Sequence, residues 1–191
     1  MSDQEFSESG NPIYRYEPEK AKKFQPAYGE ESNIEAISKH IEKHIGPIES
    51  VFHEIISEQV HIDIHWVKPS SRCPFHTLIT SGMSDLPMNT PADANELRYS
   101  ELCMLLPASW KLSVDNYEAV FSDEKNYWPL RWLKMIARFP HEYNTWVSYG
   151  HTIPNGENAE PFAENTEMGC LMLLPSISLP ADFSELKINE N

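Results

Sequence analysis

The sequence has no apolar run that approaches the roughly 20 residues of a membrane-spanning helix. Its polar, acidic N-terminus also lacks the apolar core of a secretory signal. Cysteine is scarce: Cys73, Cys103 and Cys170 are an odd number, and no two of them have Cys-x-x-Cys spacing. This scarcity argues against a disulfide framework and a zinc ribbon. It favours a reducing, cytoplasmic setting, and we expect no cofactor.

Basic residues are also few, with 15 lysines and arginines against 29 aspartates and glutamates and a net charge of −14. Nucleic-acid binding needs cations that contact phosphates, so this balance argues against it. It argues equally against an anionic membrane surface. An acidic surface attracts a basic protein partner and raises the association rate. The alternative is that the charge serves solubility alone.

The length of 191 residues suits one domain with its own core. We expect residues 1–29, which are polar and lack periodicity, to form a loosely ordered arm. Residues 30–191 are expected to form the single domain. Within it, apolar residues recur at helical spacing near its start and over 127–140, and both segments predict helices. The first apolar stripe comprises Ile34, Ile37, Ile41 and Ile45.

Six apolar runs with short polar links predict β-strands. They span residues 50–56, 60–67, 75–82, 97–107, 145–153 and 167–175. The fourth and sixth runs both end in Met-Leu-Leu-Pro, and such successive apolar residues are typical of central strands covered on both faces. The order of the elements predicts an α+β fold, with a mixed, largely antiparallel sheet flanked by helices.

The string His61-Ile62-Asp63-Ile64-His65 places two imidazoles and a carboxylate at alternating positions of a predicted strand. Such side chains share one face, so we expect His61, Asp63 and His65 to face away from the core. Two histidines at this spacing can chelate zinc. One alternative for the function is therefore a metal-dependent hydrolase centred on these three residues. The other interpretation is a strand face with ordinary polar contacts and no metal.

Two further stretches, at 77–91 and 138–157, combine aromatic or large apolar residues with polar groups in predicted loops. This composition is typical of protein-binding surfaces. It is equally typical of corner packing, where a tyrosine hydroxyl or an indole N–H bonds to the backbone. If the stretches bind a protein, the expected contact residues are Asp85, Met88, His141, Glu142, Tyr143, Trp146, Tyr149 and His151.

The same stretches carry a family resemblance. The strings TLITSGMSDLPMN, RYSELCMLLP, PLRWLKMIARFPHEYNTWVSYGHTIPNG and GCLMLLP occur in this order between residues 32 and 178. Together they resemble the suppressor-of-fused domain in its stand-alone bacterial form. Asp63 also fits the family pattern, whereas His65 does not. Members commonly continue with a further segment after the position of Pro175, so we expect a C-terminus that is shortened and leaves a sheet edge open.

The resemblance implies a mixed α/β sandwich-like domain that binds proteins and is not an enzyme. In animals the resembling protein restrains a transcription factor by holding a short peptide as an added strand between two domains. This chain is too short for both domains, so that partner is not carried over. Bacterial members include immunity proteins that neutralise toxins, and we expect a basic toxin or effector domain as the partner. A further alternative is a homodimeric structural subunit that pairs through the open edge.

Overall fold

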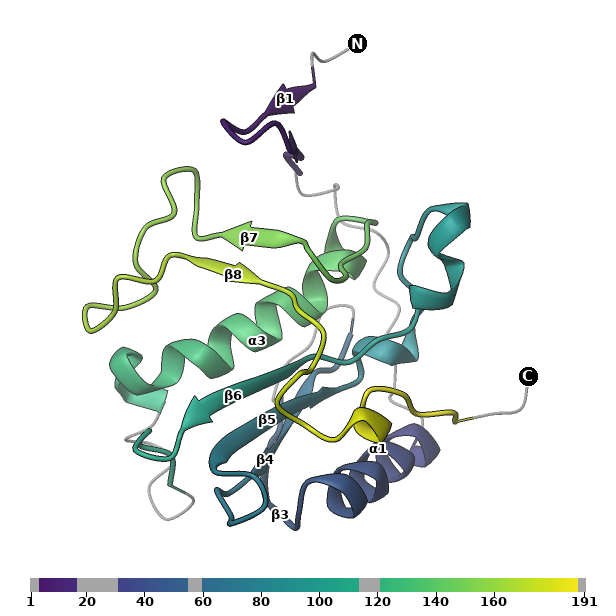
Figure 1. Cartoon of the computed structure of the whole chain (residues 1–191), viewed down its shortest axis with the longest axis vertical. Coiled ribbons are helices and arrows are strands. Elements are labelled where there is room, and N and C mark those ends of the chain that lie inside the picture. The colour runs from purple at the N-terminus through teal and green to yellow at the C-terminus, as the bar shows by residue number, and fades with distance from the viewer. Residues whose placement is uncertain (1–3, 17–30, 55–59, 114–120, 189–191) are drawn as a thin grey trace.

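The computed structural model describes residues 4–16, 31–54, 60–113 and 121–188. Its central element is a four-stranded sheet in the order β3-β4-β5-β6 (Figure 1). The strands are Ile48–Phe52 (β3), Asp63–Val67 (β4), Phe75–Ser81 (β5) and Cys103–Pro107 (β6). The strand pairs in the described part of the chain are antiparallel, which agrees with the predicted α+β class.

The helix α1 (Glu31–His44) packs on one face of this sheet. The predicted apolar stripe provides the contact: Ile37 and Ile41 are buried against Val67 of β4 and Ile79 of β5. Burial of each such side chain contributes about 1.5–3 kcal/mol. The prediction of this helix from its periodicity is therefore confirmed.

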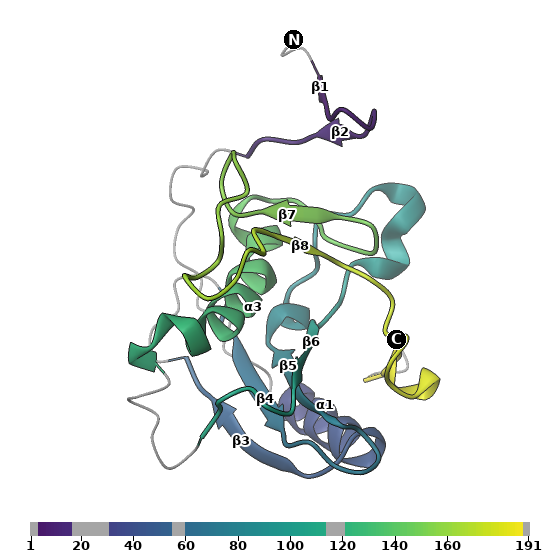
Figure 2. The ribbon, with the colours of Figure 1, turned by 60° about the vertical axis from the view of Figure 1, so that its left-hand side comes forward.

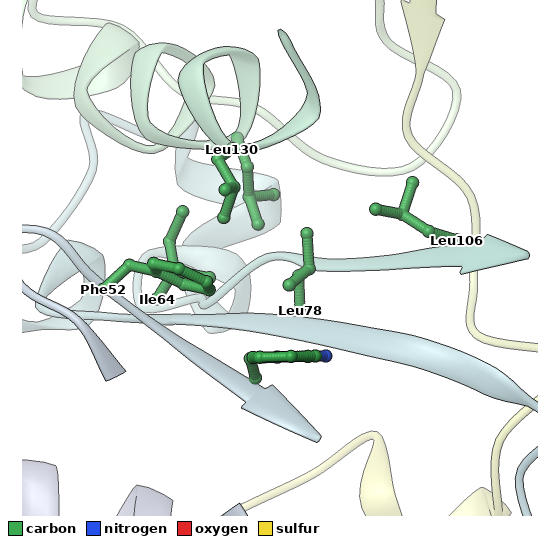
Figure 3. Packing of buried hydrophobic residues seen from close by; sticks show 7 residues of the cluster. Phe52, Ile64, Leu78, Leu106 and Leu130 are labelled. Atoms are coloured by element: carbon green, nitrogen blue, oxygen red, sulfur yellow. The ribbon is translucent and has the colours of Figure 1, made fainter. Parts of the chain in front are cut away.

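The helix α3 (Glu124–Glu142) packs on the opposite face. Leu130 lies there against strand residues that include Ile64 and Leu78 (Figure 3), and Leu133 belongs to the same cluster. The two faces receive different residues because neighbouring side chains along a strand point to opposite sides. The sheet thus forms the middle of three layers.

The helix α3 is longer than the predicted segment 127–140. It begins where the carboxylate of Asp123 accepts a hydrogen bond from the backbone N–H of Lys125 at 3.1 Å. Pro140, which we expected to end the helix, lies inside it, and the helix continues to Glu142. A proline removes its own N–H from the helix ladder, and the packing of α3 on the sheet outweighs that loss.

A second, two-stranded sheet contains β7 (Thr152–Pro154) and β8 (Cys170–Met172). Leu171 of β8 packs against the cluster that contains Trp128 and Trp132 of α3. The helix therefore contacts both sheets, as the two views show (Figures 1 and 2). Both strands are much shorter than the runs 145–153 and 167–175 that predicted them.

The first described residues form a small hairpin of β1 (Glu5–Phe6) and β2 (Pro12–Ile13). It extends away from the rest of the domain in both views (Figure 2). The hydroxyl of Tyr16, just after the hairpin, lies 2.9 Å from the hydroxyl of Thr145. The lack of periodicity in this part of the sequence did not indicate these strands.

Candidate functional site

The strand β4 does not have the outward polar face that we expected. It lies between β3 and β5, and both of its faces are covered, so that Asp63 is only 5% exposed and His65 only 2%. The expectation that His61, Asp63 and His65 share a solvent-facing surface is therefore wrong, because α1 covers the second face. His65 instead places its Nε2 at 2.9 Å from the hydroxyl of Ser81, and burial lowers the pKa of this imidazole.

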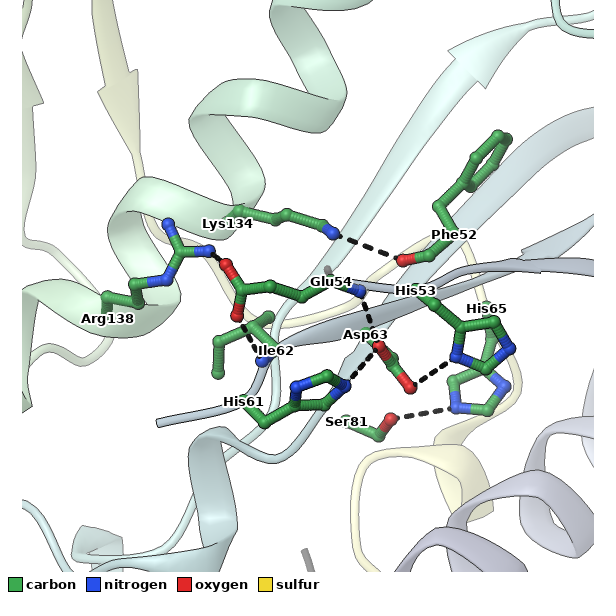
Figure 4. Close-up of polar contacts among 10 residues, drawn as sticks. All are labelled: Phe52, His53, Glu54, His61, Ile62, Asp63, His65, Ser81, Lys134 and Arg138. Atoms are coloured by element: carbon green, nitrogen blue, oxygen red, sulfur yellow. Dashed lines mark hydrogen bonds and ion pairs between the residues drawn. The ribbon is translucent and has the colours of Figure 1, made fainter. Parts of the chain in front are cut away.

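Asp63 is the centre of a polar cluster near the end of β3 (Figure 4). Its carboxylate lies 2.9 Å from Nδ1 of His53 and 3.0 Å from Nε2 of His61. It also accepts a hydrogen bond from the backbone N–H of Glu54 at 3.0 Å. Within the described ranges, no three His, Cys, Asp or Glu side chains gather in a way that could hold a metal ion. The contacts of Asp63 therefore give it a structural role, which is to hold the neighbouring chain in place.

The cluster around Asp63 continues onto α3. Glu54 forms an ion pair with Arg138, and its second carboxylate oxygen accepts the backbone N–H of Ile62 at 3.0 Å. Lys134 donates to the backbone carbonyl of Phe52 at 3.1 Å, and burial lowers the pKa of its ammonium group. These contacts join α3 to the ends of β3 and β4, which is a structural role.

Two of the four strings that carry the family resemblance meet in space. Nε2 of His141 lies 3.0 Å from the carbonyl oxygen of Met83. The backbone N–H of Asn89 donates to the carbonyl of Thr145 at 3.0 Å, and its side-chain amide donates to the carbonyl of Asn144 at 3.0 Å. These contacts of the two strings therefore hold the loop after β5 against the end of α3 and the loop that follows it.

Glu101 organises the turn after β5, and the sequence alone did not single it out. Its Oε1 accepts hydrogen bonds from the N–H of Gly82 (3.0 Å), the N–H of Ser84 (2.9 Å) and the hydroxyl of Ser84 (2.6 Å). Its Oε2 accepts from the hydroxyl of Thr80 at 2.6 Å. Burial raises the pKa of this carboxyl, and the hydrogen bonds oppose that shift. The donors in Thr-Ser-Gly-Met-Ser were the only local signal that an acceptor was needed.

A groove of about 1200 Å³ opens beside β6, with walls from α1, from the turn after β5 and from the chain that follows β8. Its lining contains a group of large hydrophobic side chains that are exposed to solvent. They are Leu86, Tyr99, Tyr149, Met172, Leu174, Ile177 and Leu186. Exposed apolar residues scattered singly need no explanation, whereas a contiguous group of them marks an interaction surface. The groove is therefore the candidate functional site.

One wall of the groove is the outer edge of β6. The N–H of Thr80 donates to the carbonyl of Leu102 at 2.9 Å, so the backbone of Leu102 faces β5. Hydrogen-bonding positions alternate along an antiparallel strand. The N–H and C=O groups of Cys103 and Leu105 therefore point away from β5, and both residues line the groove.

A second wall of the groove, at the end of β8, also has backbone groups that point away from the neighbouring strand. The N–H of Leu173 donates to the carbonyl of His151 at 2.9 Å, so the backbone of Leu173 faces the β7 side. The backbone groups of Met172 and Leu174 then point away from β7, and both of these residues also line the groove.

Both Met-Leu-Leu-Pro runs were expected to be central strands, and that expectation is wrong. In the described sheets, β6 is the last strand of its sheet and β8 has a single neighbour. Their residues are apolar on successive positions because one set packs inward and the other lines the groove. An apolar run by itself does not distinguish these two situations.

The structure divides the eight predicted contact residues. Asp85 and Tyr149 line the groove, and Tyr149 is 57% exposed. The other six lie outside its lining: Met88, His141, Glu142, Tyr143, Trp146 and His151. Of these, Met88 is buried in the core, and Trp146 packs against His151 with ring centroids 4.7 Å apart. The composition of the loops could not separate packing residues from exposed ones.

An α+β domain with an open apolar groove bounded by two strand edges belongs to the class of protein-interaction modules. The family model described as suppressor of fused protein matches residues 58–191. The chain belongs to the suppressor of fused family, whose domains are regulatory and non-enzymatic and take part in protein interactions. No curated protein and no solved structure matches the chain. In the part of the chain that is described, no helix has the length and apolar character needed to cross a membrane.

Proposed function

We propose that this domain binds an extended segment of a partner protein in the groove beside β6. The single observation that carries the proposal is that two open strand edges, at Cys103–Leu105 and at Met172–Leu174, line the same apolar groove. An extended segment that enters it can form backbone hydrogen bonds with these edges. Its apolar side chains then cover Tyr149 and its neighbours, which supplies buried area.

We infer further that the partner is basic. The chain has a net charge of −14, and Asp85 lies in the groove lining. Such a charge accelerates the association of a positively charged protein and makes it sensitive to salt. A toxin or effector domain that this protein neutralises as an immunity protein fits this chemistry.

The test uses substitutions that remove one outward-pointing N–H from each edge. The full chain selects peptides from a display library, and the best one is synthesised and titrated. We expect Cys103→Pro and Met172→Pro to weaken its binding at least about tenfold, because a proline cannot donate to an added strand. A proline on an edge strand whose N–H faces outward leaves the ladder intact, so both variants remain folded.

The matched controls are Cys103→Ala and Met172→Ala, which keep the N–H and remove the same side chain. Each alanine variant is expected to bind more tightly than the proline variant at the same position, because both lose the side chain and only the proline variant loses the N–H. If the proline and alanine variants bind equally well, the strand edges are not the binding site. A mass that rises with protein concentration in the absence of peptide identifies the homodimer as the occupant of the edges instead.

A further inference from the structure

The wall of the groove contains a carboxylate without a counter-ion. Glu101 lines the groove, and its side chain accepts four hydrogen bonds. Among the described residues, no lysine, arginine or histidine lies at ion-pair distance from it. Partial burial of an ionised carboxylate is costly unless a charge of opposite sign compensates it. The donors of Gly82, Ser84 and Thr80 are neutral and do not supply this opposite charge.

The two oxygens of Glu101 are used unequally. Oε1 accepts three hydrogen bonds, from Gly82 and Ser84, while Oε2 accepts one, from the hydroxyl of Thr80. A carboxylate has about four acceptor positions, two on each oxygen. Oε2 therefore keeps acceptor capacity for one further donor, and the groove is the space that such a donor would enter.

The other titratable groups of the groove do not fill this role. Nε2 of His40 lies 3.0 Å from the carbonyl of Phe183, which holds that ring on the chain after β8. Lys187 lines the groove without an ion pair to Glu101, and Asp85 adds a second negative charge. Burial, the largest influence on Glu101, raises the pKa of the carboxyl, which is the direction expected for a charge that lacks compensation.

We propose that Glu101 is the subsite that receives a lysine or arginine side chain of the bound partner segment. This inference rests on the proposed function and adds a chemical requirement to it. A cation at Oε2 forms a charge-assisted hydrogen bond in a partly dry groove, where such bonds are stronger than in water. The partner segment is then an extended apolar strand with one basic residue at a fixed position. The protein selects this segment by that residue as well as by the general acidity of its surface.

The test is a double-mutant cycle with a peptide selected by the full chain. The basic residue of the peptide is replaced by norleucine, which keeps the aliphatic chain and removes the charge. In the protein, Glu101→Gln keeps a carbonyl oxygen for Gly82 and Ser84, and its amide can donate to Thr80. We expect norleucine to weaken binding to the native protein at least about tenfold, and to have little effect on binding to the Glu101→Gln variant.

The control is Glu96→Gln, which removes an equal charge from an exposed residue outside the groove lining. With this variant the norleucine peptide must still bind about tenfold more weakly than the basic one. The inference is overturned if norleucine has the same effect on the native and Glu101→Gln proteins. It is also overturned if the selected peptides, shown by the proline variants to occupy the strand edges, carry no basic residue at a fixed position. Peptides that ignore the strand edges refute the proposed function instead.

The double-mutant cycle requires that the Glu101→Gln variant is folded. Its melting temperature is measured first. If the variant is unfolded, crosslinking from the ε-amine of the peptide lysine to carboxylates of the native protein replaces it. A crosslink at Glu101 supports the inference, and a crosslink confined to other carboxylates overturns it.

Discussion

Nε2 of His141 lies 3.0 Å from the carbonyl oxygen of Met83, and this contact joins two strings that are far apart in the sequence. A carbonyl oxygen only accepts hydrogen bonds, so Nε2 carries the proton and acts as the donor. Burial lowers the pKa of His141, which keeps the ring neutral near pH 7. The part of the molecule with the most specific family resemblance is thus held together by its own contacts.

The first prediction concerns this donor. His141→Ala leaves the carbonyl of Met83 without its partner, and we expect the free energy of unfolding to fall by about 1–3 kcal/mol. His141→Gln places an amide N–H at a similar distance along the side chain and should recover part of the loss. Urea denaturation measures both. Equal stability of the alanine and native proteins contradicts a structural role for His141.

The second prediction concerns Gly82, which has a φ of +105°. A Cβ at this position would lie 1.9 Å from the carbonyl oxygen of His61, which belongs to the backbone and cannot move aside cheaply. We expect Gly82→Ala to cost about 3 kcal/mol or more, from the clash together with the strained backbone. The matched control is Gly156→Ala, where φ is +72° and no atom lies within 4 Å of the added Cβ. It should cost only about 1–2 kcal/mol. Similar losses in thermal or urea unfolding would show that the close approach is unimportant.

The third prediction concerns pH. Burial lowers the pKa of His65 and of His141 from the ordinary value of 6.5. Below that value the unfolded chain binds more protons than the folded chain, so the free energy of unfolding should fall as the pH drops from 7 to 5. Glu101 acts in the opposite sense, because its raised pKa gives a contribution that is lost as the pH rises above 4.5.

Urea denaturation at several pH values measures the balance. If the two histidines cause the loss of stability, His141→Gln and His65→Gln should each make the free energy of unfolding less dependent on pH between pH 7 and 5. Unchanged slopes in both variants would show that these rings ionise alike in the folded and unfolded chains.

The fourth prediction separates packing from binding among the aromatic residues. Trp146 packs on the core cluster of Val60 and Met83, so Trp146→Ala should destabilise the isolated protein by about 2 kcal/mol or more. Tyr149 is 57% exposed and lines the groove, so Tyr149→Ala should leave stability within about 0.5 kcal/mol of the native value. The same Tyr149 variant should weaken peptide binding, as loss of an exposed aromatic contact does. A reversed pattern would place Tyr149 in the core and Trp146 at the interface.

Much of the fold follows from local patterns. The stripe that includes Ile37 and Ile41 has helical spacing, and it forms the buried face of α1. Periodicity predicts such elements because each repeat is set by neighbours within a few residues. The family strings likewise indicate an α+β protein-interaction domain from the sequence alone.

Other features depended on which elements became neighbours. The outer face of the histidine strand became buried because α1 packs against Val67, which lies on the same face of the strand as His65. The prediction of eight contact residues mixed Met88, which is buried, with Tyr149, which is exposed, because both stand in loops of the same composition.

The sequence alone determined the approximate positions of α1, α3 and the strands of the main sheet, the acidity of the chain and its family. Only the tertiary structure decided that both Met-Leu-Leu-Pro strands have open edges on one groove. It also decided that Glu101 lines this groove with no ion-pair partner among the described residues. The physical reason is that spacing along the chain reports which way a side chain points. The presence or absence of a covering strand, helix or cation depends on residues far away in the sequence.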